Sequence, residues 1–237
     1  TLQSRRYQEY LRGLSPRKEC NMVKTAVLQT AYFGPIQWYQ KLHRYDRTII
    51  EQHDSYQKQT YRNRCIIATA NGLQALTVPV ERLAGGHEVK DLRISDHNQW
   101  RRTHWNALQS AYSESPFFEY YADDIRPFYE RRIDYLIDFN EEIRQTVCQL
   151  IDISPAVEYS TTYLPADTAH GKTALTAVGD GSYDDFRQVI HAKHPLPDAD
   201  FQPRRYWQVF ERRHGFQSNL SILDLLFCMG PESVYYL

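Results

Sequence analysis

The sequence is poor in cysteine, glycine and proline, and it has no long apolar run. Its 237 residues include 4 cysteines, 10 glycines and 11 prolines. The low glycine and proline content excludes a collagen-like or linker-like chain. No stretch comes near the roughly 18 consecutive apolar residues that a membrane-spanning helix needs, so no transmembrane segment is predicted.

The four cysteines, Cys20, Cys65, Cys148 and Cys228, form no C-x-x-C motif. A chain of this length does not need disulfides to stabilise its core. We therefore interpret the cysteines as reduced thiols of a cytoplasmic protein, with a disulfide pair as the less favoured alternative.

A surplus of charge of one sign is also lacking. The chain has 28 basic and 29 acidic residues, a net charge of −1. It therefore has no basic field over the whole protein, and no nucleic acid partner is expected. The two parts of the chain differ in charge: residues 1–21 carry a net charge of +3, and the remainder carries −4. We expect residues 1–21 to be a basic arm, non-native or disordered, and residues 22–237 to form a single domain.

Familiar catalytic and metal-binding motifs are missing as well. The chain contains neither G-x-S-x-G nor H-E-x-x-H. Gly171-Lys172-Thr173 resembles the end of a phosphate-binding loop, but Ala166 stands where that loop needs a glycine. His191 and His194 lie in a proline-rich region, where a solvated pair is favoured over a metal site. No metal is predicted, and the residues name no cofactor and no oligomeric state.

Aromatic residues are abundant, with 18 tyrosines, and this content argues against disorder. The run Thr25 to Gln29 predicts a short buried strand, and residues 36–45 have the spacing of a helix. Thr48 to Glu51 is a second β-branched run. Asn71-Gly72 between apolar runs predicts a β-hairpin near residues 62–80.

The second half of the chain is expected to be mainly helical. Apolar spacing predicts helices near residues 96–113, 127–151 and 221–229. Val89 to Ile94 and Val157 to Leu164 are further strand candidates, and residues 165–205 are predicted to be rich in loops. These elements predict an α/β or α+β fold, with a mixed sheet that includes the hairpin and is packed by the helices.

Polar and aromatic residues follow the first predicted strand, where open α/β sheets commonly bind ligands. Gln29 ends the strand, and Tyr32 and Trp38 follow it. Each ring taken alone is more often part of a core than of a binding site.

Arg62, Asn63 and Arg64 precede the first apolar run of the hairpin. Arg62 and Arg64 are expected to alternate on a strand and so to share a face, where two guanidinium groups can bind phosphate or carboxylate. Asn63 would face the other way. A surface row of ion pairs is an equal alternative.

Trp100, His104 and Tyr112 share one face of the helix predicted near residues 96–113. Histidine is the side chain best suited to proton transfer near neutral pH, which makes His104 a candidate base. A histidine between aromatic rings is more often a buried structural residue.

Together these segments resemble the WbqC-like protein family. The resemblance rests on Gln29 to Trp38, on Arg62 to Arg64 with Leu76 to Val80, on Trp100, His104 and Tyr112 to Phe118, and on Tyr206 to Leu226. It extends from about Val23 to Leu237. The family is a bacterial, cytoplasmic group associated with surface-polysaccharide and O-antigen biosynthesis.

The resemblance implies a transferase that moves an acyl or aminoacyl group onto an amino sugar or a nucleotide sugar. Its partners would be a small-molecule sugar and an activated donor. The implied roles are donor phosphate binding for Arg62 and Arg64, proton transfer for His104, hydroxyl binding for Gln29 and Asn63, and sugar stacking for Tyr32, Trp38, Trp100 and Tyr112.

Two other interpretations stay open. One is a non-catalytic binding or scaffolding protein of the same pathway. The other, less favoured, is a thiol enzyme that uses Cys65 or Cys148, which lie in apolar surroundings typical of inert cysteines. An enzyme of the first kind requires Arg62 or Arg64, His104 and Gln29 to converge on one pocket.

Deletion of residues 1–21 is expected to leave the melting temperature nearly unchanged, because the first core element begins after Met22. Thermal denaturation of the full-length and shortened chains tests this. A large drop would show that the arm contributes to the fold.

Overall fold

The computed structural model describes residues 23–81, 88–165 and 183–237. The expectations for the basic arm, for Cys20 and for the Gly171-Lys172-Thr173 segment concern residues outside this part of the chain, so they stay predictions.

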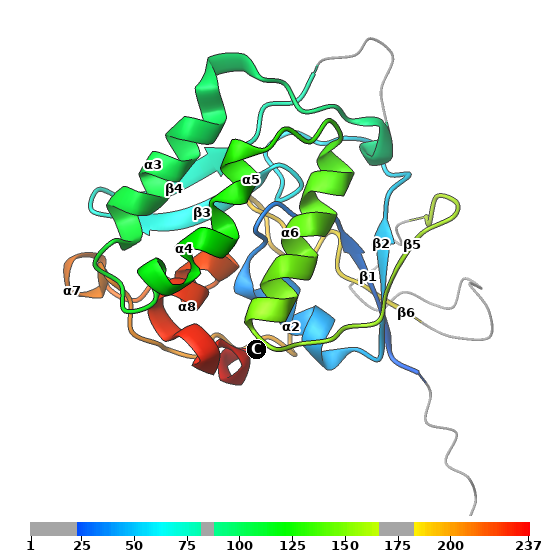
Figure 1. The fold of residues 1–237 in the computed structure, drawn as a ribbon. Coiled ribbons are helices and arrows are strands. Elements are labelled where there is room, and N and C mark those ends of the chain that lie inside the picture. Colours follow the sequence, from blue (N-terminus) through cyan, green and yellow to red (C-terminus); the bar gives the residue numbers. More distant parts are fainter. Residues whose placement is uncertain (1–22, 82–87, 166–182) are drawn as a thin grey trace, which may run out of the picture.

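A four-stranded parallel sheet forms one side of the described structure (Figure 1). The strand order is β5-β2-β1-β6. The bounds are Thr25–Gln29 for β1, Arg47–Glu51 for β2, Val157–Tyr159 for β5 and Tyr183–Asp185 for β6. β1 is a central strand that pairs with β2 on one side and β6 on the other. Its apolar run is buried, as is typical of a parallel sheet covered on both faces.

The predicted hairpin is confirmed. β3 (Arg64–Thr69) pairs with β4 (Gly72–Thr77) in antiparallel fashion around a two-residue loop, Ala70-Asn71. Gly72 has a φ of 106°, which a residue with a side chain rarely adopts. The α/β character is confirmed too, and the strands are distributed over two sheets because the hairpin forms its own.

Seven α-helices complete the described part of the fold. They are α2 (Ile36–Arg44), α3 (Trp100–Tyr112), α4 (Phe118–Ile125), α5 (Pro127–Glu130), α6 (Leu136–Leu150), α7 (Glu211–His214) and α8 (Ile222–Met229). Three 3-10 helices are η1 (Val89–Asp91), η2 (His97–Gln99) and η3 (Gly230–Tyr236). None of the helices in the described ranges is long and apolar enough to cross a membrane.

Several element boundaries differ from the predicted ones. The helix predicted near residues 96–113 begins at Trp100, because Asn98 and Gln99 have positive φ angles of 63° and 49°. The helix expected over 127–151 is two helices, because the backbone is extended at Arg131. The strand expected at 89–94 contains η1 instead, and the strand expected at 157–164 ends at Tyr159.

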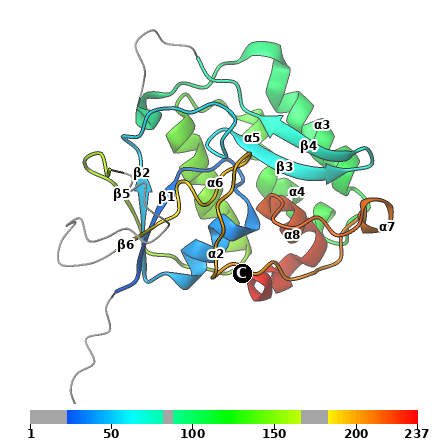
Figure 2. The same ribbon diagram turned by 180° about the vertical axis from the view of Figure 1, so that it is seen from behind.

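The parallel sheet and the hairpin lie on opposite sides, with α6, α2 and the β1–α2 connection between them (Figures 1 and 2). The connection is buried: Ala31, Tyr32 and Phe33 are 3% exposed or less. Ser221 fastens it to the hairpin, since its backbone N–H donates to the Ile66 carbonyl and its hydroxyl donates to the Phe33 carbonyl. Residues far apart in sequence therefore hold the β1–α2 connection against the hairpin.

The cysteines of the described residues are buried and free. Burial raises the pKa of Cys65 to about 12 and the pKa of Cys148 to about 11. Such thiols are poor nucleophiles near neutral pH, so the geometry does not favour a thiol enzyme.

Gly230 lies at the end of α8, where its φ is 56°, and a Cβ atom there would lie 2.6 Å from the ring of Phe117. Gly230→Ala is expected to lower the free energy of unfolding by roughly 1–3 kcal/mol more than Gly215→Ala, by overpacking the ring. Gly215 is a matched control, because its φ is 73° and a Cβ atom added there would meet nothing within 4 Å. If urea denaturation showed the same decrease in the free energy of unfolding for both variants, overpacking of the Phe117 ring would be contradicted.

Candidate functional site at the carboxyl edge of the parallel sheet

Buried polar residues terminate all four parallel strands. Gln29, Glu51 and Asp185 are the last residues of β1, β2 and β6, and Ser160 follows β5. Each is 7% exposed or less. With Asp54, Arg62 and Arg187, these residues form the carboxyl-edge site.

Arg187 connects the strand ends. Its guanidinium donates from Nε to Asp185 Oδ1 at 3.0 Å and from Nη1 to the Leu164 carbonyl at 2.7 Å. Nη1 also lies 3.8 Å from Glu51 Oε2. Gln29 Nε2 donates to the Arg187 carbonyl. One residue therefore contacts the ends of β1, β2 and β6 and the loop after β5.

Glu51 organises the loops above β2 and β5. Its carboxylate accepts hydrogen bonds from the His53 N–H at 2.7 Å, the Ser160 hydroxyl at 2.9 Å and the Leu164 N–H at 2.8 Å. These bonds are what a buried carboxylate requires.

Arg62 is buried against Asp54, with which it forms an ion pair. Burial lowers the pKa of Arg62, Asp54 opposes this, and the nearby charge of Arg187 lowers it further. Burial also acts to lower the pKa of Arg187, but its bonds to Asp185 outweigh burial and raise it. The two guanidinium groups thus influence each other within one site.

Gln29 has an unused acceptor. Its Nε2 donates a hydrogen bond, but no group in the described residues donates to its Oε1. Because the residue is only 6% exposed, water does not readily supply the missing donor. A buried carboxamide oxygen without a donor costs roughly 1–3 kcal/mol. This orphaned acceptor is what a ligand donor would satisfy.

The site lies where the strand order reverses. The chain passes from β1 to β2 and β5 on one side, whereas β6 pairs with the other side of β1. Open α/β sheets bind ligands at the carboxyl ends of strands at such a switch point. Gln29 of β1 and Arg187 after β6 meet there.

The site differs from a dinucleotide site. In those folds the N-terminus of the first helix binds phosphate. Here the Ile36 N–H of α2 donates to the Leu220 carbonyl and the Gln37 N–H donates to Asn219 Oδ1. The chain itself therefore uses the donors that would hold a phosphate.

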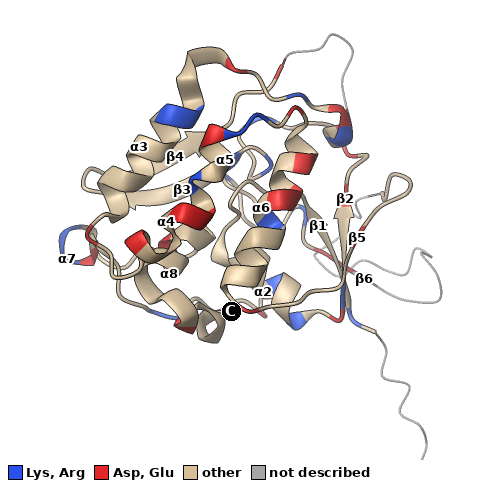
Figure 3. Ribbon diagram, viewed as in Figure 1, with Lys and Arg blue, Asp and Glu red and all other residues tan. Residues whose placement is uncertain are grey.

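Charge at this edge is mixed. The site contains three carboxylates and two guanidinium groups (Glu51, Asp54, Asp185, Arg62 and Arg187). Figure 3 shows acidic and basic segments interspersed around η1, whose Lys90 N–H donates to the Gln52 carbonyl after β2. Among the described residues, no cluster of histidine, cysteine and carboxylate side chains could hold a metal.

Residues 29–236 match the profile of the WbqC-like protein family. The chain belongs to this family. It is also similar to the uncharacterized protein Rv1507c of Mycobacterium tuberculosis strain H37Rv, with 32% identity over 232 residues that cover 91% of this chain and 98% of that protein. No solved structure matches the chain. The resemblance that the motifs indicated is therefore confirmed, and the matched region includes the whole carboxyl-edge site.

The structure brings only two of the predicted site residues into the carboxyl-edge site, Gln29 and Arg62. The shared strand face expected for Arg62 and Arg64 is wrong, because β3 begins at Arg64 and Arg62 lies in the preceding turn. Arg64 Nε donates to Thr77 Oγ1 at 3.0 Å, within the hairpin. Asn63 Nδ2 donates to the Val78 carbonyl at 2.7 Å.

The predicted aromatic residues lie in the core of this WbqC-like protein. Trp38 Nε1 donates to the Gln29 carbonyl at 2.9 Å, and the Tyr112 hydroxyl donates to Asp224 at 2.7 Å. Trp100 packs on His104 with ring centroids 5.1 Å apart. All are buried. Sugar stacking by these rings and by Tyr32 stays a prediction, and the contacts give each of them a packing role.

His104 is buried among aromatic rings. Its Nδ1 is 2.9 Å from the Tyr32 hydroxyl, which also contacts the Tyr129 hydroxyl at 3.0 Å. Burial lowers the pKa of His104 to about 4, against a weaker upward effect of a bond to the Thr77 backbone. A base needs a pKa near the working pH, so this geometry does not favour His104 as the base, and that role stays a prediction.

Five residues of the site were missed from the sequence. They are Glu51, Asp54, Ser160, Asp185 and Arg187. Glu51 was recognisable as the last residue of a predicted β run, as Gln29 was. Asp185 and Arg187 lie in the segment predicted to be loops, where a three-residue strand leaves no periodic signal.

The lowered pKa of His104 predicts a pH dependence of stability. The unfolded chain binds a proton on this histidine near pH 6.5, whereas the folded chain does so only near pH 4. The free energy of unfolding therefore falls as the pH drops through this window, by roughly 3 kcal/mol from this residue. His104→Gln is expected to remove that part of the decrease.

Urea denaturation across the window measures this effect. His97→Gln is the matched control, because His97 is exposed on η2 and should leave the wild-type pH dependence intact. If the free energy of unfolding fell equally with pH in the wild type and in His104→Gln, the lowered pKa of His104 would not be the cause of the decrease.

Proposed function

We propose that this WbqC-like protein is a cytoplasmic transferase of bacterial surface-polysaccharide biosynthesis. It moves an acyl or aminoacyl group onto an amino sugar or nucleotide sugar, and the carboxyl-edge site binds the amino sugar. The observation that carries the proposal is the orphaned Gln29 Oε1 at the switch point between β1 and β6.

The chemistry of the site suits a ligand that donates hydrogen bonds. The orphaned group is an acceptor, and the carboxylates outnumber the guanidinium groups. Arg62 and Arg187 are already paired with Asp54 and Asp185, so they are poorly placed to neutralise a phosphate. Sugar hydroxyls and an amino group supply the donors that such a site lacks.

Acyl transfer to an amine also needs a proton acceptor. As the nitrogen attacks the acyl carbon, the N–C bond forms, the leaving group departs with its electron pair and the nitrogen loses a proton. The side chain of Asp54 is 17% exposed, whereas Glu51 and Asp185 are more deeply buried. Asp54 is therefore the carboxylate of this site that a substrate amine can reach.

The alternative is a non-catalytic binding protein of the same pathway. The observation that favours it is the burial of His104 and of the thiols in the described residues. Both functions require the same ligand, and turnover of an amino sugar with an acyl donor separates them.

The ligand preference can be tested with UDP-glucosamine and UDP-glucose, which differ only in the amine at C2. UDP-glucosamine is expected to bind at least about tenfold more tightly, because a hydrogen bond from a charged donor contributes roughly 1.5–3 kcal/mol. Gln29→Met is expected to remove this preference. Isothermal titration calorimetry measures it.

Gln40→Met is the matched control. Gln40 is also buried, its Nε2 also donates to a backbone carbonyl, that of Asp200, and its Oε1 also lacks a donor in the described residues, but it lies on α2 away from the site. It should keep the preference. Equal binding of both ligands by the wild type, or equal effects of the two variants, would contradict the proposal.

A further inference from the structure

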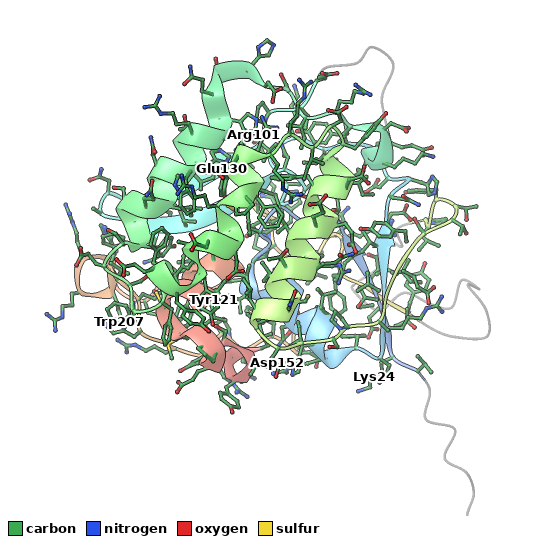
Figure 4. All side chains as sticks on the ribbon, viewed as in Figure 1. Lys24, Arg101, Tyr121, Glu130, Asp152 and Trp207 are labelled. Carbon is green, nitrogen blue, oxygen red and sulfur yellow. The ribbon has the colours of Figure 1, made fainter. Side chains whose placement is uncertain are left out.

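A second polar region lies at the opposite, amino edge of the parallel sheet. A cavity of about 600 Å³ there is bordered by Lys24 before β1, by Tyr45 between α2 and β2, and by Asp184 of β6. Figure 4 labels Lys24 at the start of β1, close to α2. Lys24 and Gln29 lie at opposite ends of β1, about 16 Å apart along the strand, and the neighbouring Asp184 and Asp185 of β6 point to opposite faces of the sheet, so the cavity and the carboxyl-edge site use different side chains.

Two of its cations, Lys24 and Arg204, have no carboxylate partner within the described residues. Arg204 Nη1 donates to the Tyr235 carbonyl, and Arg44 Nη2 donates to a main-chain oxygen of Leu237 at 2.8 Å. The Tyr235 carbonyl fixes the position of the Arg204 guanidinium without neutralising it. The remaining N–H groups are therefore available to an anion.

The fourth cation of the cavity differs. Lys41 Nζ lies 2.7 Å from Asp198 and 4.5 Å from the centre of the Phe186 ring, and its side chain is 1% exposed. This lysine is paired and holds the 198–204 segment against α2. It forms part of the cavity wall, and the cations that an anion can contact are Lys24, Arg44 and Arg204.

The cavity also contains acceptors. Asp184 accepts a hydrogen bond from the Tyr45 hydroxyl at 2.7 Å, and Asp200 makes no ion pair with any described residue. Burial and the bond to Asp184 raise the pKa of Tyr45, and the charges of Asp200 and Asp198 add to this. Two carboxylates therefore stand close to the cations without contacting them.

We propose that this cavity binds a sugar phosphate. The phosphate accepts hydrogen bonds from Lys24, Arg44 and Arg204, and the sugar hydroxyls donate to Asp184 and Asp200. A nucleotide fits less well, because Tyr45 is the one aromatic residue of the described lining and its ring packs edge-on against Phe186. The volume is within the range of small-molecule sites.

Titration calorimetry with glucose 6-phosphate tests the proposal. Arg44→Gln and Arg204→Gln should each weaken binding about tenfold or more, through loss of a charge-assisted hydrogen bond. Both side chains are exposed, so the fold should tolerate the changes. Arg102→Gln is the matched control, because Arg102 is an exposed arginine of α3 outside the cavity, and it should bind like the wild type.

Two further arms identify the ligand class and separate the two sites. Asp200→Asn should weaken glucose 6-phosphate binding and should not weaken inorganic phosphate binding. Gln29→Met should leave glucose 6-phosphate binding unchanged, and Arg44→Gln should preserve the preference for UDP-glucosamine. Absence of glucose 6-phosphate binding at millimolar concentration, equal affinity for inorganic phosphate, or insensitivity to Arg44→Gln and Arg204→Gln would overturn the proposal.

Discussion

A guanidinium withdrawn from water must be surrounded by acceptors, and Arg187 meets this requirement with groups from several separate segments. Asp185 belongs to β6, the Leu164 carbonyl to the loop after β5, and Glu51 to the end of β2. The same residue accepts from Gln29 of β1 through its own carbonyl. Because these partners lie far apart in sequence, the pairing of Arg187 and the alignment of the strand ends depend on each other.

This constraint explains the character of the site. The seven residues of the carboxyl-edge site are almost fully paired, and within the part of the chain that the structure describes Gln29 Oε1 is the buried side-chain oxygen of this site that lacks a donor. The β1–α2 connection cannot serve as a phosphate loop, because Ser221 and the segment before α8 occupy its donors and acceptors. The carboxyl edge therefore suits a ligand rich in hydrogen-bond donors, and the proposed anion site lies at the amino edge. The family membership of the chain names no reaction.

Local signals in the sequence were sufficient for part of this structure. β1, the Asn71-Gly72 hairpin and α8 have strong apolar patterns bounded by turn residues, and all three were predicted. β6 was not, because its three residues are stabilised by pairing with β1 more than 150 residues away rather than by their own pattern. Gln29 could be selected because it ends a recognisable strand, whereas the burial of Arg62 against Asp54 and of His104 against Tyr32 depends on tertiary contacts.

The central claim is that an amino sugar binds between β1 and β6 and satisfies Gln29. A crystal structure of the protein with UDP-glucosamine tests it most directly. The account predicts the amine nitrogen of the sugar within about 3 Å of Gln29 Oε1, next to Arg62, Asp54 and Arg187. A sugar bound elsewhere, including the cavity at the amino edge, with Gln29 Oε1 untouched by the ligand, would contradict it.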